Sequence, residues 1–198
     1  KKMQIQKSLN FMSKEKAILL ASFFLFCNDL PMKKYISIIL FAFSFNAFAV
    51  PYATVKEFIK NLALQNPTTT ELVSIGYSSN KEEILGLKIG HGSVNHLVVA
   101  THHGNEYGST EVAKAFAAEL AKEPLRDRTV FIIPVLNTSG YNKNQRNELG
   151  YDPNRDYPGP CVTSSSFNLS STKALASFIE KNNIVASATL HTYYPGVL

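Results

Sequence analysis

The sequence is organised around a polar loop at residues 101–108, which separates an apolar run from a helical pattern. Residues 97–100 are apolar and β-type, and residues 109–122 repeat apolar side chains at helical spacing with small alanines between them. The loop therefore connects a strand to a helix. A loop of this kind holds polar groups at the end of a rigid strand. His103 and Glu106, three residues apart, can turn an imidazole and a carboxylate toward one point.

An imidazole and a carboxylate in this arrangement are half of a metal site. A catalytic zinc ion usually takes three protein ligands, often two neutral imidazoles and one carboxylate, and leaves a fourth position for water. His191 is the expected third ligand, because it ends the strand-like run 184–190 and opens a turn-rich segment. We therefore expect His103, Glu106 and His191 to bind one zinc ion. A lone His-x-x-Glu also occurs by chance, as a solvated salt link in a loop.

The neighbouring His102 is a weaker candidate for a metal ligand. Only His103 stands three residues before Glu106, and adjacent residues at a strand end point to opposite sides. We expect His102 to face away from the metal. Two imidazoles and one carboxylate leave the zinc site with a net positive charge, which favours hydrolytic chemistry over redox chemistry.

Two arginines lie in a long polar stretch between the two halves of the predicted metal site. Residues 144–156 read Asn-Gln-Arg-Asn-Glu-Leu-Gly-Tyr-Asp-Pro-Asn-Arg-Asp, within a polar stretch whose length in a compact domain is usually functional or disordered. An isolated charged side chain is solvated by default. Two guanidiniums facing a zinc site, Arg146 and Arg155, instead favour an anion-binding surface, because arginine binds carboxylates in a bidentate way.

Taken in order, the motifs of residues 97–198 resemble those of the zinc carboxypeptidase family, the metallocarboxypeptidases related to pancreatic carboxypeptidase A. The shared order is His-x-x-Glu, Asn-x-x-Gly-Tyr at 137–141, an arginine shortly before Asp-x-Asn-Arg at 152–155, and a strand that ends in His-Thr-Tyr at 191–193. Several ordered motifs are more specific than any one of them. The resemblance implies an enzyme that removes carboxy-terminal residues from peptides.

The resemblance also implies roles for three polar side chains. Arg146 is expected to stabilise the oxyanion that develops during hydrolysis, and Asn154 and Arg155 are expected to hold the free terminal carboxylate of a peptide substrate. This division predicts an exopeptidase. The sequence departs from the commoner family pattern at 137–140, where Pro-Asp usually follows Asn, and at Asp156, where Asn is common. Neither departure removes a predicted metal ligand.

One part of the family's machinery has no counterpart in these residues. In the family, the catalytic glutamate and a substrate-capping tyrosine follow the last zinc histidine, whereas seven residues follow His191 here. Glu111 and Glu119 belong to the helix after the metal loop, and Glu148 is expected to be solvated. We expect the 198 residues to be a fragment with about half of the family's catalytic domain, and to be inactive alone.

Two other functions remain open from the sequence. A zinc amidase or deacylase of the same superfamily, acting on cell-wall peptides or small acyl-amino acids, is the alternative within hydrolases. A non-catalytic zinc-binding or peptide-binding protein is the alternative of another class. The Asn154-Arg155 pair and the His-Thr-Tyr at 191–193 favour the peptidase. A glutamate after a strand beyond Leu198 would distinguish these functions.

The first 49 residues have the pattern of a leader. Residues 32–49 combine the basic start Met32-Lys33-Lys34, an apolar middle and the small-x-small ending Ala47-Phe48-Ala49, which predicts a signal peptide cleaved between Ala49 and Val50. The apolar run is short for a membrane anchor. We expect a secreted or periplasmic protein. Residues 1–31 precede this start and are expected not to belong to the mature protein; a longer leader is the alternative.

The charge and the cysteines limit the partners. The net charge of +5 lies entirely within the first 49 residues, and the remainder is neutral, so we expect no nucleic-acid partner. After cleavage Cys161 would be the only cysteine, which makes a disulfide within this chain unexpected. Cys161 is either a small buried residue or paired beyond Leu198. We expect a monomer.

The order of elements predicts an α/β domain at residues 50–198. Helical patterns alternate with strand-like runs, which indicates a mixed, largely parallel twisted sheet with helices on both faces, as in zinc carboxypeptidases, but truncated. The expected elements are a helix from a capping box at 54–57, strands at 71–77, 84–89, 129–135 and 184–190, and a helix at 170–182 with Leu175, Phe178 and Ile179 inward.

Overall fold

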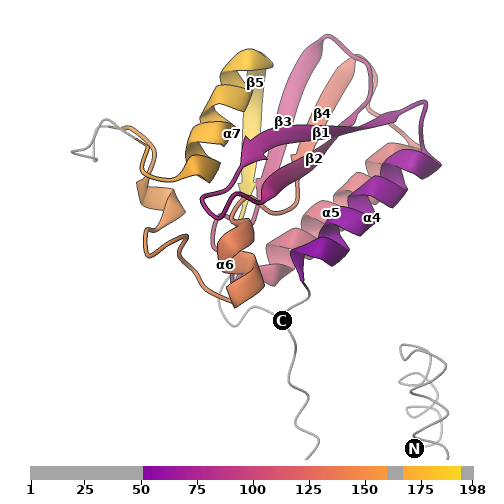
Figure 1. The fold of residues 1–198 in the computed structure, drawn as a ribbon. Coiled ribbons are helices and arrows are strands. Elements are labelled where there is room, and N and C mark those ends of the chain that lie inside the picture. The colour runs from indigo at the N-terminus through magenta and orange to yellow at the C-terminus, as the bar shows by residue number, and fades with distance from the viewer. Residues whose placement is uncertain (1–50, 160–166, 193–198) are drawn as a thin grey trace, which may run out of the picture. The chain divides into compact units, whose positions relative to one another are not determined.

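The computed structural model describes residues 51–159 and 167–192. In this part of the chain, strands form a five-stranded sheet in the order β1-β2-β4-β3-β5 (Figure 1). The strands are β1 Thr70–Tyr77, β2 Glu83–Ile89, β3 Val94–Ala100, β4 Arg128–Ile133 and β5 Ile184–Leu190. Strand β2 pairs antiparallel with β1 and β4, whereas β3 pairs parallel with β4 and β5. The mixed sheet of the predicted α/β fold is confirmed.

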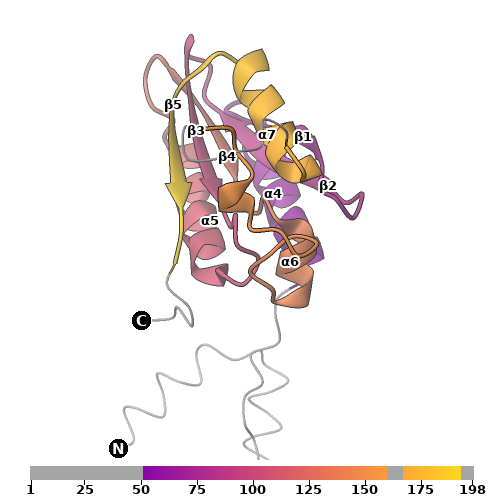
Figure 2. The same cartoon turned by 90° about the vertical axis from the view of Figure 1, so that its left-hand side faces the viewer.

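Helices cover both faces of this sheet, as expected. They are α4 Tyr52–Gln65, α5 Tyr107–Lys122, α6 Thr138–Lys143 and α7 Ser170–Lys181, with the 3-10 turn η2 Pro153–Arg155. Helices α4 and α5 lie on one face and α7 on the other (Figures 1 and 2). Among the helices described here, none is both long enough and apolar enough to cross a membrane.

Several sequence predictions concern residues outside the described part of the chain. The upstream segment 1–31, the signal peptide 32–49, Cys161 and Tyr193 all fall there. What the sequence predicts for these residues is therefore not tested by the structure.

Strand β4 shows how the core is divided between the two faces. Val130 and Ile132 pack toward α4 and α5, and Phe131 and Ile133 pack toward α7. Successive side chains of a strand point to opposite faces, so a strand covered on both sides is apolar throughout. Burying each of these side chains contributes about 1.5–3 kcal/mol. The sheet is therefore a rigid base for the loops at its ends.

The predicted capping box at the start of α4 is wrong. The helix begins at Tyr52, and its N-cap residue Pro51 makes no side-chain cap. The first turn is held from outside the helix instead. The Tyr52 N–H donates to Asn142 Oδ1 at 2.9 Å, and the buried Tyr52 hydroxyl accepts from the Leu85 N–H at 2.9 Å. These tertiary contacts move the helix start upstream of the local signal at Thr54.

Helix α5 packs on the sheet through small residues rather than through the large apolar ones of its periodic pattern. Ala113 and Ala117 are fully buried, whereas Val112 is 55% exposed and Phe116 40% exposed. Of the large residues at helical spacing, Leu120 alone is buried in the described structure. Small side chains let the helix lie close to the sheet, which places its first turn next to the end of β3.

The turn out of β3 has an uncommon backbone conformation. Thr101 is fully buried and has φ +58°, a region that β-branched residues rarely adopt. Its hydroxyl lies 2.9 Å from Ser109 Oγ and 2.6 Å from Thr110 Oγ1, and donates to the Pro134 carbonyl at 3.1 Å. This buried network holds the strained turn in place, and the turn directs the following histidines.

The prediction that Glu148 is solvated is wrong, because its side chain is completely buried. Its carboxylate accepts hydrogen bonds from the Ser79 N–H at 2.8 Å and from the Ser171 hydroxyl. A tight turn directs it inward, since Leu149 and the following glycine have positive φ. Glu148 and Tyr151 also exchange both backbone hydrogen bonds. Glu148 thereby joins the polar loop to the β1–β2 turn and to the start of α7.

Asp156 makes a second buried anchor for the same loop. It accepts from the N–H groups of Asn168 and Leu169 and from the Thr172 hydroxyl. Burial raises the pKa of the Asp156 carboxyl, but these hydrogen bonds outweigh it and hold the pKa below the ordinary value. The ionised carboxylate therefore fixes the beginning of α7.

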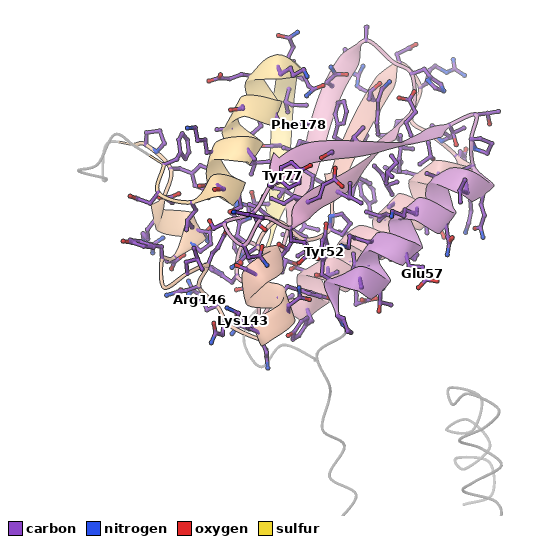
Figure 3. The ribbon with its side chains drawn as sticks, in the orientation of Figure 1. Tyr52, Glu57, Tyr77, Lys143, Arg146 and Phe178 are labelled. Atoms are coloured by element: carbon purple, nitrogen blue, oxygen red, sulfur yellow. The ribbon has the colours of Figure 1, made fainter. Side chains whose placement is uncertain are left out.

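The burial of Glu148 gives a stability prediction. Glu148→Ala would leave the Ser79 N–H and the buried Ser171 hydroxyl without their acceptor, and an unsatisfied buried group costs about 1–3 kcal/mol. We expect a loss of this size in the free energy of unfolding, measured by urea denaturation. The control is Glu57→Ala, at an exposed position of α4 (Figure 3), with an expected change within about 0.5 kcal/mol. Equal losses in the two variants would contradict the anchoring role.

Candidate active site

The three predicted metal ligands converge in the structure. His103, Glu106 and His191 each offer a ligand atom, and these atoms lie within 4.8 Å of one another. Glu106 Oε1 is 2.8 Å from His103 Nδ1, and Glu106 Oε2 is 2.8 Å from His191 Nδ1. The two histidines follow the neighbouring parallel strands β3 and β5, whose ends are in register at Ala100 and Leu190. The sheet therefore brings together groups that are distant in sequence.

The loop of residues 101–108, which carries His103 and Glu106 and is called the metal loop here, lies directly against the backbone of α6. A Cβ atom at Gly104 would stand 2.1 Å from the Gly140 carbonyl carbon, so only glycine fits at position 104. Asn137 fixes the same contact, because its amide donates to the carbonyls of His102 and Arg146 and accepts from the Gly140 N–H at 2.8 Å. The Asn-x-x-Gly segment at 137–140 thus joins the metal loop to the polar loop 144–156, which contains Arg146.

Glu106 is a buried carboxylate with a complete set of hydrogen-bond donors. It is 6% exposed, and besides both histidines it accepts from the Thr192 N–H at 3.2 Å. Burial raises the pKa of Glu106, but the hydrogen bonds from His103, His191 and Thr192 outweigh it and hold the pKa below the ordinary value. The carboxylate is therefore ionised, as a metal ligand must be.

Asp152 supports His103 from its other side, a role that the sequence did not reveal. Asp152 Oδ1 is 3.1 Å from His103 Nε2, and Oδ2 accepts from Arg146 Nη2 at 3.1 Å. Burial raises the Asp152 pKa, and hydrogen bonds from the Asn154 N–H, Arg146 and His103 outweigh it, so the pKa is lowered. An ionised Asp152 is an acceptor for the Nε2–H of His103, and it would keep that proton in place when Nδ1 binds a metal.

The three predicted substrate-binding side chains lie at different places relative to the candidate metal ligands. Arg146 is half-exposed beside α6 (Figure 3), and its Nη1 lies 4.0 Å from Glu106 Oε1. The Asn154 amide lies 3.1 Å from His191 Nε2. Arg155 is exposed, and its Nη1 donates to the Asn154 carbonyl at 3.3 Å. Arg146 and Asn154 therefore border the metal ligands directly, whereas Arg155 is next to them in the chain.

His102 does not belong to the converging cluster. It is buried, and its Nε2 lies 2.8 Å from the Tyr157 hydroxyl. Burial, followed by the neighbouring His191 and His103, lowers the pKa of His102 to about 4. His102 is thus a neutral side chain that packs beside the ligands, with its ring centroid 5.6 Å from that of His191.

The residues present fit a zinc ion. Two imidazole nitrogens and one carboxylate are the donor set of many catalytic zinc sites, and each histidine turns Nδ1 toward Glu106. Nε2 of His103 lies 3.1 Å from the carboxylate of Asp152, the kind of acceptor that usually supports a metal-binding histidine, and Nε2 of His191 lies 3.1 Å from Asn154 Nδ2. The His191 side chain is 33% exposed, so the cluster is open to solvent on that side.

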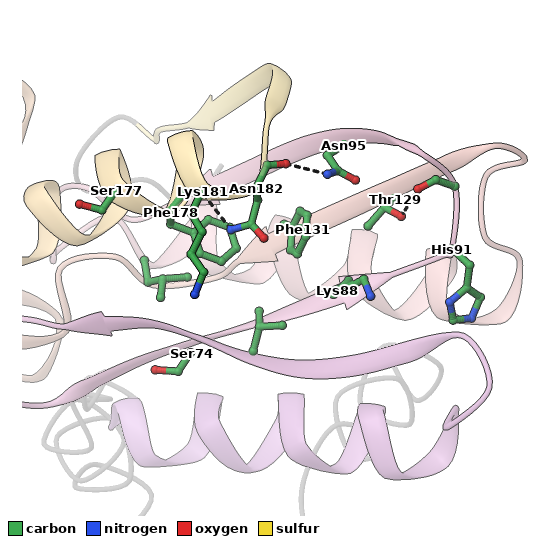
Figure 4. Close-up of a pocket in the computed structure, with 13 residues that line it drawn as sticks. Ser74, Lys88, His91, Asn95, Thr129, Phe131, Ser177, Phe178, Lys181 and Asn182 are labelled. Carbon is green, nitrogen blue, oxygen red and sulfur yellow. Dashed lines mark hydrogen bonds between the residues drawn. The ribbon is translucent and has the colours of Figure 1, made fainter.

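A separate hollow lies at the other ends of the parallel strands, between α7 and the sheet (Figure 4). It has a volume of about 610 Å³. Several of its polar groups are bonded within the protein: the Asn95 amide donates to the Asn182 carbonyl, Thr129 Oγ1 to the Gly92 carbonyl, and Lys88 pairs with Glu71. The hollow is thus distinct from the cluster of His103, Glu106 and His191, which lies at the opposite ends of these strands.

Comparison with known proteins identifies the family of the chain. The sequence model of the family described as zinc carboxypeptidase matches residues 55–198. Carboxypeptidase D of Mus musculus is 24% identical over 160 residues, which cover 68% of this chain and 12% of that protein. The chain thus spans about an eighth of the length of this relative.

Solved structures agree at the level of the fold. The crystal structure of thrombin activatable fibrinolysis inhibitor has a TM-score of 0.64 at 20% identity, covering 76% of this chain and 51% of that chain. Carboxypeptidase A from Helicoverpa armigera has a TM-score of 0.64 at 18% identity, covering 73% and 46%. The predicted carboxypeptidase-like fold is confirmed.

The contact between Asp152 and His103 gives a prediction about metal affinity. Asp152→Asn removes the charge that fixes the His103 tautomer, and loss of such a support typically weakens metal binding about 10–100-fold. We expect a loss of this size in zinc affinity, measured by competition with a chelator of known affinity. Asp127→Asn, at an exposed position, is the control for the same chemical change. Unchanged zinc affinity in Asp152→Asn would show that Asp152 does not support the site.

Proposed function

The chain belongs to the zinc carboxypeptidase family, and on this premise we propose that the whole protein is a zinc-dependent carboxypeptidase that hydrolyses the carboxy-terminal bond of peptides. One observation carries the proposal. His103, Glu106 and His191 form a single cluster with the Arg146 guanidinium 4.0 Å from Glu106. A hydrolytic metal donor set next to a cation suits the cleavage of a substrate that develops negative charge.

His103, Glu106 and His191 would hold the zinc ion, which when bound activates water and polarises a carbonyl group. The other side chains prepare this centre. Asp152 keeps the proton of His103 on Nε2. Arg146, half-exposed and next to Glu106, would donate to the carbonyl oxygen of the substrate as negative charge develops there.

The terminal carboxylate of the substrate would be bound by the η2 turn. Asn154 and Arg155 are adjacent on this turn, and the Asn154 amide already lies at the edge of the metal cluster. The Arg155 guanidinium is exposed and bonded to a backbone carbonyl, so it can turn to an incoming carboxylate without breaking an ion pair among the described residues. A substrate bound in this way would present its last peptide bond to the metal.

We also propose that the general base is supplied from outside residues 51–198. The described carboxylates near the metal cluster are already engaged: Glu106 bonds both histidines, and Asp152 bonds His103 and Arg146. Glu148 is buried against Ser79 and Ser171. General-base catalysis contributes about 10²–10⁴-fold, so residues 51–198 alone would have little or no activity.

Arg155 gives the test of exopeptidase specificity. In the whole protein, Arg155→Ala should reduce kcat/KM for a peptide with a free terminal carboxylate by roughly 10–100-fold, the typical effect of losing a charge-assisted contact. The same peptide with an amidated terminus should be a poor substrate that loses little further. Arg126→Ala, at an exposed position, is the control.

Two results would contradict this proposal. Equal losses on the free and amidated peptides would show that Arg155 does not bind the carboxylate. Hydrolysis of small acyl-amino acids without cleavage of any peptide by the wild type would favour an amidase or deacylase.

We propose further that the protein is exported, on the pattern of residues 32–49. Protein expressed from Met32 should be cleaved after Ala49 and recovered outside the cytoplasm, as amino-terminal sequencing would show. Ala49→Arg should block cleavage, since the site requires a small residue. A mature chain that still begins at or before Met32 would contradict export by this signal.

A further inference from the structure

The hollow between α7 and the sheet is a second candidate site, at the far end of the strands from the metal cluster. Its volume of about 610 Å³ is within the range of small-molecule sites, about 300–1,000 Å³. Three parts of the fold surround it: the end of α7, the strands β1, β2 and β4, and the turn at 91–92 (Figure 4). None of the described residues that line it takes part in the proposed hydrolysis.

Two phenylalanines give the hollow an apolar floor. Phe131 of β4 and Phe178 of α7 are packed edge to face, with ring centroids 5.1 Å apart and an angle of 87° between the rings. Both belong to the core, with exposed fractions of 4% and 8%, so the floor is in place before any ligand binds. Val73 and Ile75 of β1 border it. A floor of this kind favours a flat apolar group, which packs against ring faces and edges.

The rim of the hollow is cationic. Lys88 and Lys181 line it, and no acidic residue of the described structure does. Lys181 extends from the last turn of α7 toward the strands (Figure 4), and it is in no ion pair of the described part of the chain. Its ammonium group is therefore available to an anion that enters the hollow.

Lys88 has a partner, but only at the surface. Its Nζ lies 3.2 Å from Glu71 Oε1, and the two side chains are 31% and 53% exposed. Because ion pairs at this exposure contribute little, Lys88 can turn from Glu71 toward an anion at small cost. The helix and the sheet thus each contribute a positive charge to the same opening.

Hydrogen bonds fix the walls of the hollow. The Asn95 amide donates to the Asn182 carbonyl at 2.6 Å, which joins the end of α7 to the start of β3. The Asn182 amide in turn donates to the Phe178 carbonyl at 2.8 Å. On the other side, Thr129 Oγ1 donates to the Gly92 carbonyl at 2.7 Å. A ligand would therefore find walls that are already ordered, which lowers the entropic cost of binding.

We propose that this hollow is a second ligand site, which takes a small organic anion with a flat apolar body and one carboxylate or sulfonate group. The body lies on Phe131 and Phe178, and the anionic group bonds Lys181 at the rim. Both lysines repel a cation of the same shape, so the site selects by the sign of the charge. The site goes beyond the proposed function, because the hollow and the metal cluster lie at opposite ends of the strands.

The test uses 2-naphthoate as a probe, because its two fused rings and single carboxylate have the proposed chemistry. Its binding to the whole protein is measured by isothermal titration calorimetry. Lys181→Glu replaces attraction with repulsion and should weaken binding roughly tenfold or more. Lys173→Glu makes the same charge change at an exposed position near the start of α7 and should leave the affinity unchanged.

Two further measurements test the apolar contact and the sign of the charge. Ser177 is exposed, borders the hollow and lies one helical turn before Lys181. Ser177→Trp should fill part of the hollow with its indole ring and weaken 2-naphthoate binding, with wild-type thermal stability. The ligand 2-naphthylmethylamine has the same rings and is a cation at neutral pH, so it should bind at least roughly tenfold more weakly than 2-naphthoate.

The Arg155→Ala variant separates this site from the proposed carboxylate site at the η2 turn. Binding that is weakened by Lys181→Glu and Ser177→Trp but kept in Arg155→Ala would support the inference, whether or not the wild type cleaves peptides. Binding that is lost in Arg155→Ala and kept in Lys181→Glu would assign the ligand to the η2 turn and overturn the inference. No measurable binding of 2-naphthoate, or equal binding of the amine, would overturn it as well.

Discussion

The carboxylate of Glu106 is the contact on which the candidate site depends. Its two oxygens face Nδ1 of His103 and Nδ1 of His191, two residues that follow different strands and are joined through a buried anion. Burying a carboxylate without hydrogen-bonded partners is strongly unfavourable. The hydrogen bonds to Glu106 therefore favour the observed positions of both imidazoles. Parallel pairing of β3 and β5 brings both histidines to the same edge of the sheet, and a metal ion would replace the protons between the three side chains.

Around this centre, buried polar side chains fix loops that have little regular structure. Asn137 joins the metal loop to α6 and to the Arg146 carbonyl, and the Gly104–Gly140 contact admits no side chain. Glu148 and Asp156 bind the long polar loop to the β1–β2 turn and to the start of α7. Since Arg146 and Asp152 belong to this loop, its anchors also determine where the groups around the candidate metal site lie.

Sequence reasoning found the three converging candidate ligands because their signals are local: His103 and Glu106 share a strand-to-helix loop, and His191 ends a strand-like run. It failed where burial depends on tertiary contacts. The large apolar residues of α5 recur at helical spacing, but this spacing does not tell which of them are buried: Val112 and Phe116 are exposed, and alanines pack against the sheet. Glu148 looks like a solvated loop residue until a turn with positive φ at Leu149 directs it inward. Charge and spacing alone do not contain that information.

Anomalous diffraction at the zinc absorption edge, from crystals of the whole protein grown with zinc, tests the central claim most directly. The account predicts one zinc peak in contact with Nδ1 of His103, Nδ1 of His191 and the carboxylate of Glu106. A peak bound through Nε2 of either histidine, a peak that includes His102 as a ligand, or zinc bound only away from Glu106 would contradict it.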